Sequence, residues 1–144
     1  MKRNRTPIAV TLATAALISG CQGMPSEAEM EEQVQIVHAN VDELAAFFGE
    51  HPEVVQDYVG LCDIEISDEG EEVLYDLRIP MDRITFLTIA EQLPAHYEEK
   101  GWTPSPDLGD DFNYYFYNGD EYVSVTFRPR RDEVDITGGS GCRH

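Results

Sequence analysis

Residues 112–128 read FNYYFYNGDEYVSVTFR, the pattern of two β-strands joined by a turn. Two runs rich in aromatic and β-branched residues, 112–117 and 121–128, flank the pair Asn118-Gly119. Both residue types tolerate positive φ, so such a pair between strand-like runs is the strongest short-range signal for a β-hairpin. A further run at residues 133–137 follows a turn at 129–132. The C-terminal third is therefore predicted to be an antiparallel meander of three strands.

A second hairpin is predicted upstream of this meander. Apolar and polar residues alternate along residues 62–66, and the alternation returns at residues 73–79 after an acidic turn that contains Gly70. A period of two places the apolar side chains of each run on one face of a strand. Residues 51–58, which begin with His51-Pro52, are predicted to form a short helical or irregular segment.

Two helices are predicted from apolar spacing and capping residues. Ser26 and Glu29 match a capping box, and the apolar residues that follow to Phe48 recur at spacings of three and four. Asp82 is a candidate cap for a second helix that Gly101 ends, and Pro94 should kink it or shorten its last turn. Residues 103–111 are predicted to form a loop, and residues 138–141 a flexible lead to Cys142.

These elements give the order α-β-β-α-β-β-β with short connections. Short connections favour antiparallel neighbours, so the fold class is α+β. We expect two main helices on one face of an antiparallel sheet of about five strands, in a single domain that spans residues 26–144.

The N-terminal segment has the pattern of a secretory signal. Lys2, Arg3 and Arg5 precede an uncharged apolar run at residues 7–18, which is too short to span a membrane comfortably. The run ends in LISGC at residues 17–21, where a branched aliphatic residue and two small residues precede Cys21.

This ending resembles the lipobox of bacterial lipoproteins. The resemblance implies that residues 1–20 are a cleaved signal peptide, that the Cys21 thiol carries a diacylglycerol, and that residues 21–25 form a short tether. It also implies a place on the extracytoplasmic face of the cell membrane. An ordinary cleaved signal, or a buried helix with an incidental Cys, is the alternative. From the second helix onward the layout resembles small lipoproteins of high-GC Gram-positive bacteria with no assigned activity, so it implies no chemistry.

Charge excludes one function class. The chain has 10 Lys and Arg and 28 Asp and Glu, and removing the three bases of the signal leaves 7 − 28 = −21. Nucleic-acid binders need basic surfaces that displace counterions from phosphates, and this chain has no basic stripe of that kind. Such an acidic domain would be held at the bilayer by lipid and not by charge.

The cysteine count points to a disulfide. Once Cys21 is assigned to the lipid, Cys62 and Cys142 remain as a pair outside the reducing cytosol, and we expect them to be bonded. Two unpaired thiols are the alternative. Metal ligation is a weaker one, because neither Cys has a neighbouring His or Cys at ligand spacing.

Two candidate binding surfaces stand out. Alternation sends Tyr115 and Tyr117 to one face of their strand, where exposed rings with polar tips suit a glycan, a peptide or a protein. Ordinary cross-strand pairing is the alternative. Asp107, Asp110 and Asp111 gather in one loop, where the alternative is a solvated acidic loop. We predict no catalytic residue, no metal site and no cofactor, because no catalytic or phosphate-binding motif occurs.

Three functions remain open at this point. The leading one is a lipid-anchored, extracytoplasmic and noncatalytic domain that binds a protein or envelope component through its acidic surface or its Tyr-bearing sheet face. A small envelope hydrolase that uses carboxylates is the second. A structural or stress-related envelope protein without a dedicated ligand is the third.

Overall fold

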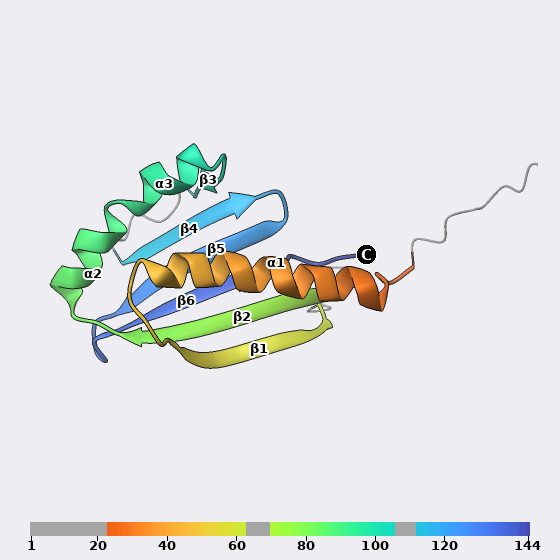
Figure 1. Ribbon diagram of the computed structural model, residues 1–144, viewed down its shortest axis with the longest axis horizontal. Coiled ribbons are helices and arrows are strands. Elements are labelled where there is room, and N and C mark those ends of the chain that lie inside the picture. The colour runs from red at the N-terminus through yellow and green to blue at the C-terminus, as the bar shows by residue number, and fades with distance from the viewer. Residues whose placement is uncertain (1–22, 63–69, 106–111) are drawn as a thin grey trace, which may run out of the picture.

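Three helical segments lie on one face of a six-stranded antiparallel sheet, whose strand order is β1-β2-β6-β5-β4-β3 (Figure 1). The computed structural model describes residues 23–62, 70–105 and 112–144. The elements are α1 (Glu27–Ala46), β1 (Glu53–Leu61), β2 (Glu71–Pro80), α2 (Arg83–Ala90), α3 (Leu93–Glu99), β3 (Thr103–Pro104), β4 (Asn113–Asn118), β5 (Glu121–Arg128) and β6 (Glu133–Gly139). The predicted α+β class is confirmed, with six strands in place of about five.

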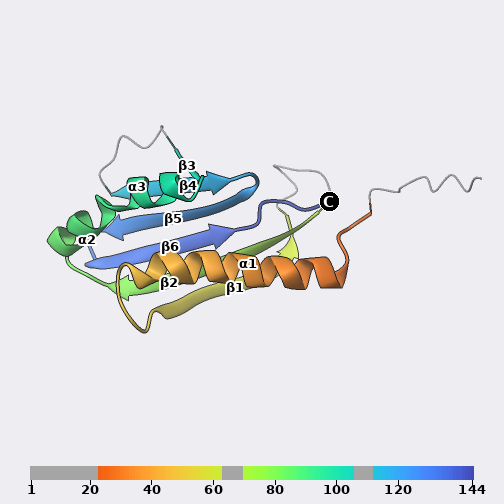
Figure 2. The same cartoon turned by 45° about the horizontal axis from the view of Figure 1, so that its top comes forward.

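Helix α1 begins at the predicted capping box. The Glu29 amide donates to the Ser26 hydroxyl, and the Ser26 amide donates to the Glu29 carboxylate at 2.6 Å. Val37, Val41 and Leu44 are buried along one stripe of the helix, as the spacing of three and four requires. Figure 2 shows α1 running along the sheet over β2 and β6.

The second predicted helix is divided into α2 and α3. The Thr85 amide donates to Asp82 at 3.0 Å, which confirms the predicted cap. Pro94 lies in the first turn of α3, where its missing N–H would have no helical partner in any case. Its ring would clash with the carbonyl four residues earlier, that of Ala90, and α2 ends at that residue. Pro94 thus separates two helices instead of shortening the end of one.

The prediction for residues 51–58 is wrong, because most of them belong to strand β1. This strand pairs with β2, with Tyr58 opposite Leu74 and Val59 opposite Val73. A register shift between Val54 and Gln56 interrupts the period-two pattern, so the alternation of apolar and polar residues does not indicate a strand at this position. Cys62 follows the end of β1, and the rest of the strand predicted at 62–66 lies outside the described residues.

The C-terminal meander is confirmed, with changes at its ends. Asn118 pairs with Glu121, so the loop between β4 and β5 is Gly119-Asp120 and not Asn118-Gly119. The predicted loop at 103–111 begins with the short strand β3, which pairs with β4. Strand β6 continues to Gly139, so the first half of the predicted flexible segment belongs to the sheet.

Close packing explains why β6 ends in glycines. A Cβ added to Gly138 would lie 2.2 Å from a methyl carbon of Val41, so α1 approaches the sheet at a distance that only glycine permits. The remaining core lies between the helices and the same face of the sheet. Phe86 stacks on Phe127, and Tyr97 stacks on Phe116 with ring centroids 4.2 Å apart.

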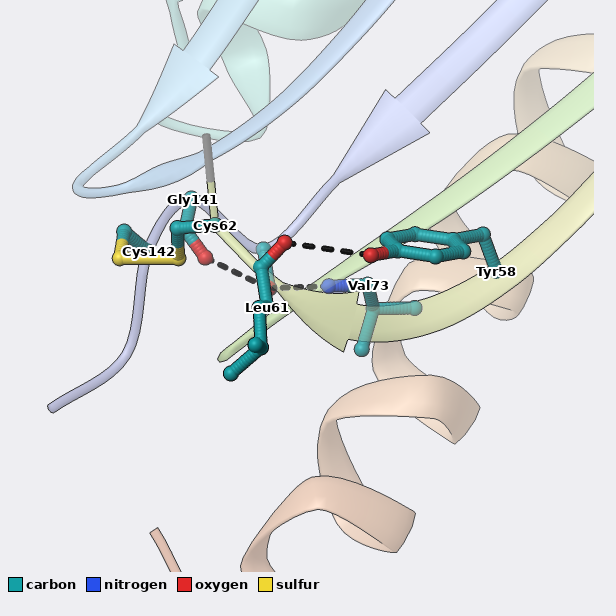
Figure 3. Close-up of a disulfide and its surroundings, with 7 residues drawn as sticks. Tyr58, Leu61, Cys62, Val73, Gly141 and Cys142 are labelled. Atoms are coloured by element: carbon teal, nitrogen blue, oxygen red, sulfur yellow. Dashed lines mark hydrogen bonds between the residues drawn. A yellow bond between two sulfur atoms is a disulfide. The ribbon is translucent and has the colours of Figure 1, made fainter. Parts of the chain in front are cut away.

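The predicted disulfide between Cys62 and Cys142 is present, with the two Cα atoms 5.8 Å apart (Figure 3). It joins the end of β1 to the C-terminal segment. Arg143 holds the same segment in place, because its guanidinium lies 3.1 Å from the Gln33 side chain of α1 and 3.5 Å from the Glu121 carboxylate. The start of α1, the end of β1 and the C-terminus therefore meet at one end of the molecule (Figure 1).

Candidate binding face of the sheet

The second face of the sheet, here called the open face, carries no helix in the described part of the chain. Along β2, Val73, Tyr75, Leu77 and Ile79 are buried toward the helices, and the residues between them point to the open face. Pairing aligns the open-face residues of neighbouring strands into rows. One row contains Tyr58, Leu74, Gly139, Tyr122 and Tyr117, and the next contains Gln56, Asp76, Thr137, Ser124 and Tyr115.

A hollow of about 440 Å³ lies on the open face over β4, β5 and β6. It lies where two small side chains, Ser124 and Thr137, are paired next to the larger ring of Tyr115. The lining residues are Tyr115, Tyr117, Tyr122, Ser124, Thr126, Arg128, Asp135 and Thr137. The lining is thus made of aromatic rings, hydroxyl groups and one Arg–Asp pair.

Both tyrosines predicted from alternation lie in this hollow. Tyr117 is 41% exposed, and its ring centroid lies 6.4 Å from that of Tyr122 on the next strand. Tyr122 was not singled out from the sequence, because its place beside Tyr117 depends on the register between β4 and β5. The Asn-Gly signal located that hairpin, although the loop differs by one residue from the prediction.

Tyr122 is held in place by the strand beneath it. A Cβ added to Gly139 would lie between 2.6 and 2.9 Å from three atoms of the Tyr122 side chain, so the ring rests directly on the glycine backbone. Burial raises the pKa of the Tyr122 phenol to about 12, and the nearby carboxylates of Asp76 and Glu72 add to this effect. The phenol is protonated at neutral pH, as an ordinary tyrosine is, and burial keeps it so in more alkaline solution.

A charge network borders the hollow on the side of β2 and β6. The Arg78 guanidinium donates to the Asp135 carboxylate at 2.9 Å, and Arg128 contacts the other oxygen of the same carboxylate. Glu133 lies 3.5 Å from both Arg78 and Arg131. These contacts hold Arg128 and Asp135 in the wall of the hollow.

Asp76 lies outside this network. Burial raises the pKa of its carboxyl above the ordinary value, although a hydrogen bond with Thr137 works in the opposite direction. One of its oxygens is buried and has no hydrogen-bond partner. An ionised Asp76 is therefore a cost to the folded state, which is unusual for a strand residue on an uncovered sheet face.

The remaining predicted site residues, Cys21, Asp107, Asp110 and Asp111, are outside the described residues. Within the described ranges, no group of three or more His, Cys, Asp or Glu side chains could hold a metal ion. The described helices also include none with the length and apolar content needed to cross a membrane.

Comparison with known proteins adds no relative. Neither the protein-family models, nor the curated proteins, nor the solved structures contain a match to this chain.

Proposed function

We propose that this protein is a lipid-anchored, extracytoplasmic and noncatalytic domain that binds a glycan component of the cell envelope in the hollow of its open face. Support for the anchor comes from the sequence, where a basic start, an apolar run and a small-residue pair precede Cys21 in the order that a lipobox requires. The Cys62–Cys142 disulfide is compatible with an oxidising compartment.

The observation that carries the binding proposal is the lining of the hollow. Three tyrosines offer flat apolar rings with polar tips, and three hydroxyl side chains lie between them. A sugar ring has the complementary chemistry, with C–H faces that pack on aromatic rings and hydroxyl groups that exchange hydrogen bonds with Ser, Thr, Arg and Asp. The volume of the hollow is within the range of small-ligand sites.

The test measures retention of the whole detergent-solubilised protein on purified envelope polysaccharide. Removing one ring with Tyr117→Ala should reduce retention about tenfold, which corresponds to the contribution of one well-packed aromatic contact. Ile84→Ala is the matched control, because Ile84 is an exposed apolar residue on α2, away from the open face. Equal retention of Tyr117→Ala and the unsubstituted protein, or no retention of either, would contradict the proposal.

One observation favours the envelope hydrolase as a second candidate. Asp76 and Asp135 are diagonal neighbours on β2 and β6. Their environments differ, because burial raises the pKa of the Asp76 carboxyl, whereas Asp135 forms ion pairs with Arg78 and Arg128. Two carboxyls in such different environments are the arrangement that acid–base catalysis needs. A hydrolase would lose its activity on polysaccharide with Asp76→Asn, whereas a binding domain would keep its retention.

A further inference from the structure

Strand β1 exposes an unusual amount of apolar surface. All nine of its residues are exposed except Gly60, which is half-buried. Five of the eight large apolar residues that are exposed in the described part of the chain belong to it, namely Val54, Val55, Tyr58, Val59 and Leu61. Val59 and Leu61 point to the helix side of the sheet, and both side chains stay exposed there, at 46% and 61%. A strand of this composition is normally covered.

The main chain of β1 also forms an edge of the sheet, and no other described strand pairs with its outer side. The Cys62 amide donates to the Gly70 carbonyl, and both backbone groups of Glu71 are bonded to Arg143 instead of Leu61. Because backbone groups alternate in direction along an antiparallel strand, those of Asp57, Val59 and Leu61 point away from β2. The Tyr58 hydroxyl donates to the Leu61 carbonyl at 3.1 Å, which closes one end of this edge (Figure 3). The backbone N–H and C=O groups of Asp57 and Val59 therefore point away from the sheet.

The usual protections of an edge strand are weak at this position. Proteins block such edges with Lys, Pro, bulges or inward-pointing charges. The bulge of β1 lies between Val54 and Gln56, and the pairing with β2 is regular from Gln56 to Leu61. Asp57 is the charged residue of β1 that points toward the helices, and its carboxylate oxygen lies 2.9 Å from the Nε2 atom of His38 in α1. The segment from Asp57 to Leu61 is therefore a regular edge with apolar side chains.

Charge decides which kind of chain can pair with this edge. Strand β1 contains no basic residue. On the open face it carries Glu53, and its partner β2 carries Glu72 opposite Gly60 and Asp76 opposite Gln56. A second copy would bring the same acids against each other, with 28 Asp and Glu in each chain. An extended segment with basic side chains would instead be attracted by these acids.

We propose that β1 is a strand-addition site for an extended peptide segment of a partner protein, one that alternates aliphatic residues with Lys or Arg. The added strand hydrogen-bonds to the backbone of Asp57 and Val59. Its aliphatic side chains lie beside Val59 and Leu61, and its basic side chains point to the open face. This site is separate from the hollow, which lies over β4, β5 and β6.

The probe is the labelled peptide VKVKVKVK, titrated into the whole detergent-solubilised protein. Val59→Pro removes one outward N–H and no hydrogen bond between β1 and β2, and proline is tolerated on edge strands. We expect at least tenfold weaker binding in this variant, and at most threefold weaker binding in the matched control Val59→Thr, which keeps the N–H. Tyr117→Ala, which tests the hollow, should leave peptide binding unchanged.

Peptide variants test the same claim without altering the protein. Methylation of alternate backbone nitrogens along the pairing edge should abolish binding, and so should the peptides VEVEVEVE and VVVVKKKK. The proposal is overturned if Val59→Pro binds like the unsubstituted protein or if VVVVKKKK binds equally well, which would indicate attraction by charge alone. It is equally overturned if sedimentation detects a dimer that Val59→Pro dissociates, because the occupant would then be a second copy.

Discussion

At the scale of single residues, Gly138 sets the distance between α1 and the sheet. A side chain at this position meets Val41 on the helix side and the Tyr122 carbonyl at 3.3 Å. Gly138→Ala should lower the free energy of unfolding by about 1 to 3 kcal/mol, because α1 must move away from β6. Urea unfolding with the disulfide intact measures this, and Gly23→Ala, at an exposed position, is the control. Equal stability of the two variants would contradict the packing described for α1.

Asp76 should make the fold less stable as the pH rises. Its folded-state pKa lies above the ordinary value of 3.8, so the folded protein holds this proton more tightly than the unfolded chain. The cost is absent below pH 3.8 and complete above the folded-state pKa. Asp76→Asn should therefore raise the free energy of unfolding at pH 7, and the gain should vanish as the pH falls toward 3.8.

Asp135→Asn is the matched comparison for Asp76→Asn on the neighbouring strand. It weakens the contacts with Arg78 and Arg128, so it should lower the free energy of unfolding at pH 7 by about 1 to 3 kcal/mol. Thermal unfolding of both variants between pH 3.5 and pH 8 measures the two effects. A stability loss in both would show that Asp76 is satisfied in the folded state.

At the scale of elements, the sequence predicts most strands but neither of the two edge strands, β1 and β3. Strand β5 is predicted at its observed bounds, because its alternation is regular and a hairpin signal precedes it. The bulge of β1 breaks the alternation, and His51-Pro52 imitates a helix start. The division of the second helix follows from Pro94, because a proline ring clashes with the carbonyl four residues earlier, that of Ala90, and this spacing can be read in the sequence.

The disulfide joins two elements that are far apart in the sequence. It closes a loop with a sequence separation of 80, for which the chain-entropy model gives about 4 kcal/mol. Replacing Cys62 and Cys142 together with Ser should lower the free energy of unfolding by about this amount. Cys21→Ser is the control and should leave the stability of the domain unchanged. A loss below about 1 kcal/mol in the double variant would show that Arg143 and the pairing of Glu71 hold the C-terminal segment without the bond.

At the scale of the whole molecule, only part of the candidate site could be predicted from the sequence. Alternation places Tyr115 and Tyr117 on one face without any knowledge of the fold. The hollow also needs Ser124 and Thr137, which reach it only through pairing between β4, β5 and β6. Pairing across three strands is a property of the sheet, so no local pattern could have predicted the hollow.

The arrangement of the ends gives the proposed anchor a structural consequence. Helix α1 starts at Glu27, six residues after Cys21, at the end of the molecule that also holds the disulfide and the C-terminus (Figure 1). A lipid on Cys21 would bring this end toward the bilayer. Acidic residues are frequent there, including Glu27 and Glu29 in the first turn of α1, so anionic headgroups would repel it and leave the lipid as the attachment.

The intact mass of the protein extracted from membranes, before and after reduction, tests the lipid anchor and the disulfide in one measurement. We expect a chain that begins at Cys21, carries the added mass of a diacylglycerol, and gains two hydrogens when the bond between Cys62 and Cys142 is reduced. A full chain of 144 residues that begins at Met1, is recovered from the soluble fraction and has three thiols open to alkylation would contradict both.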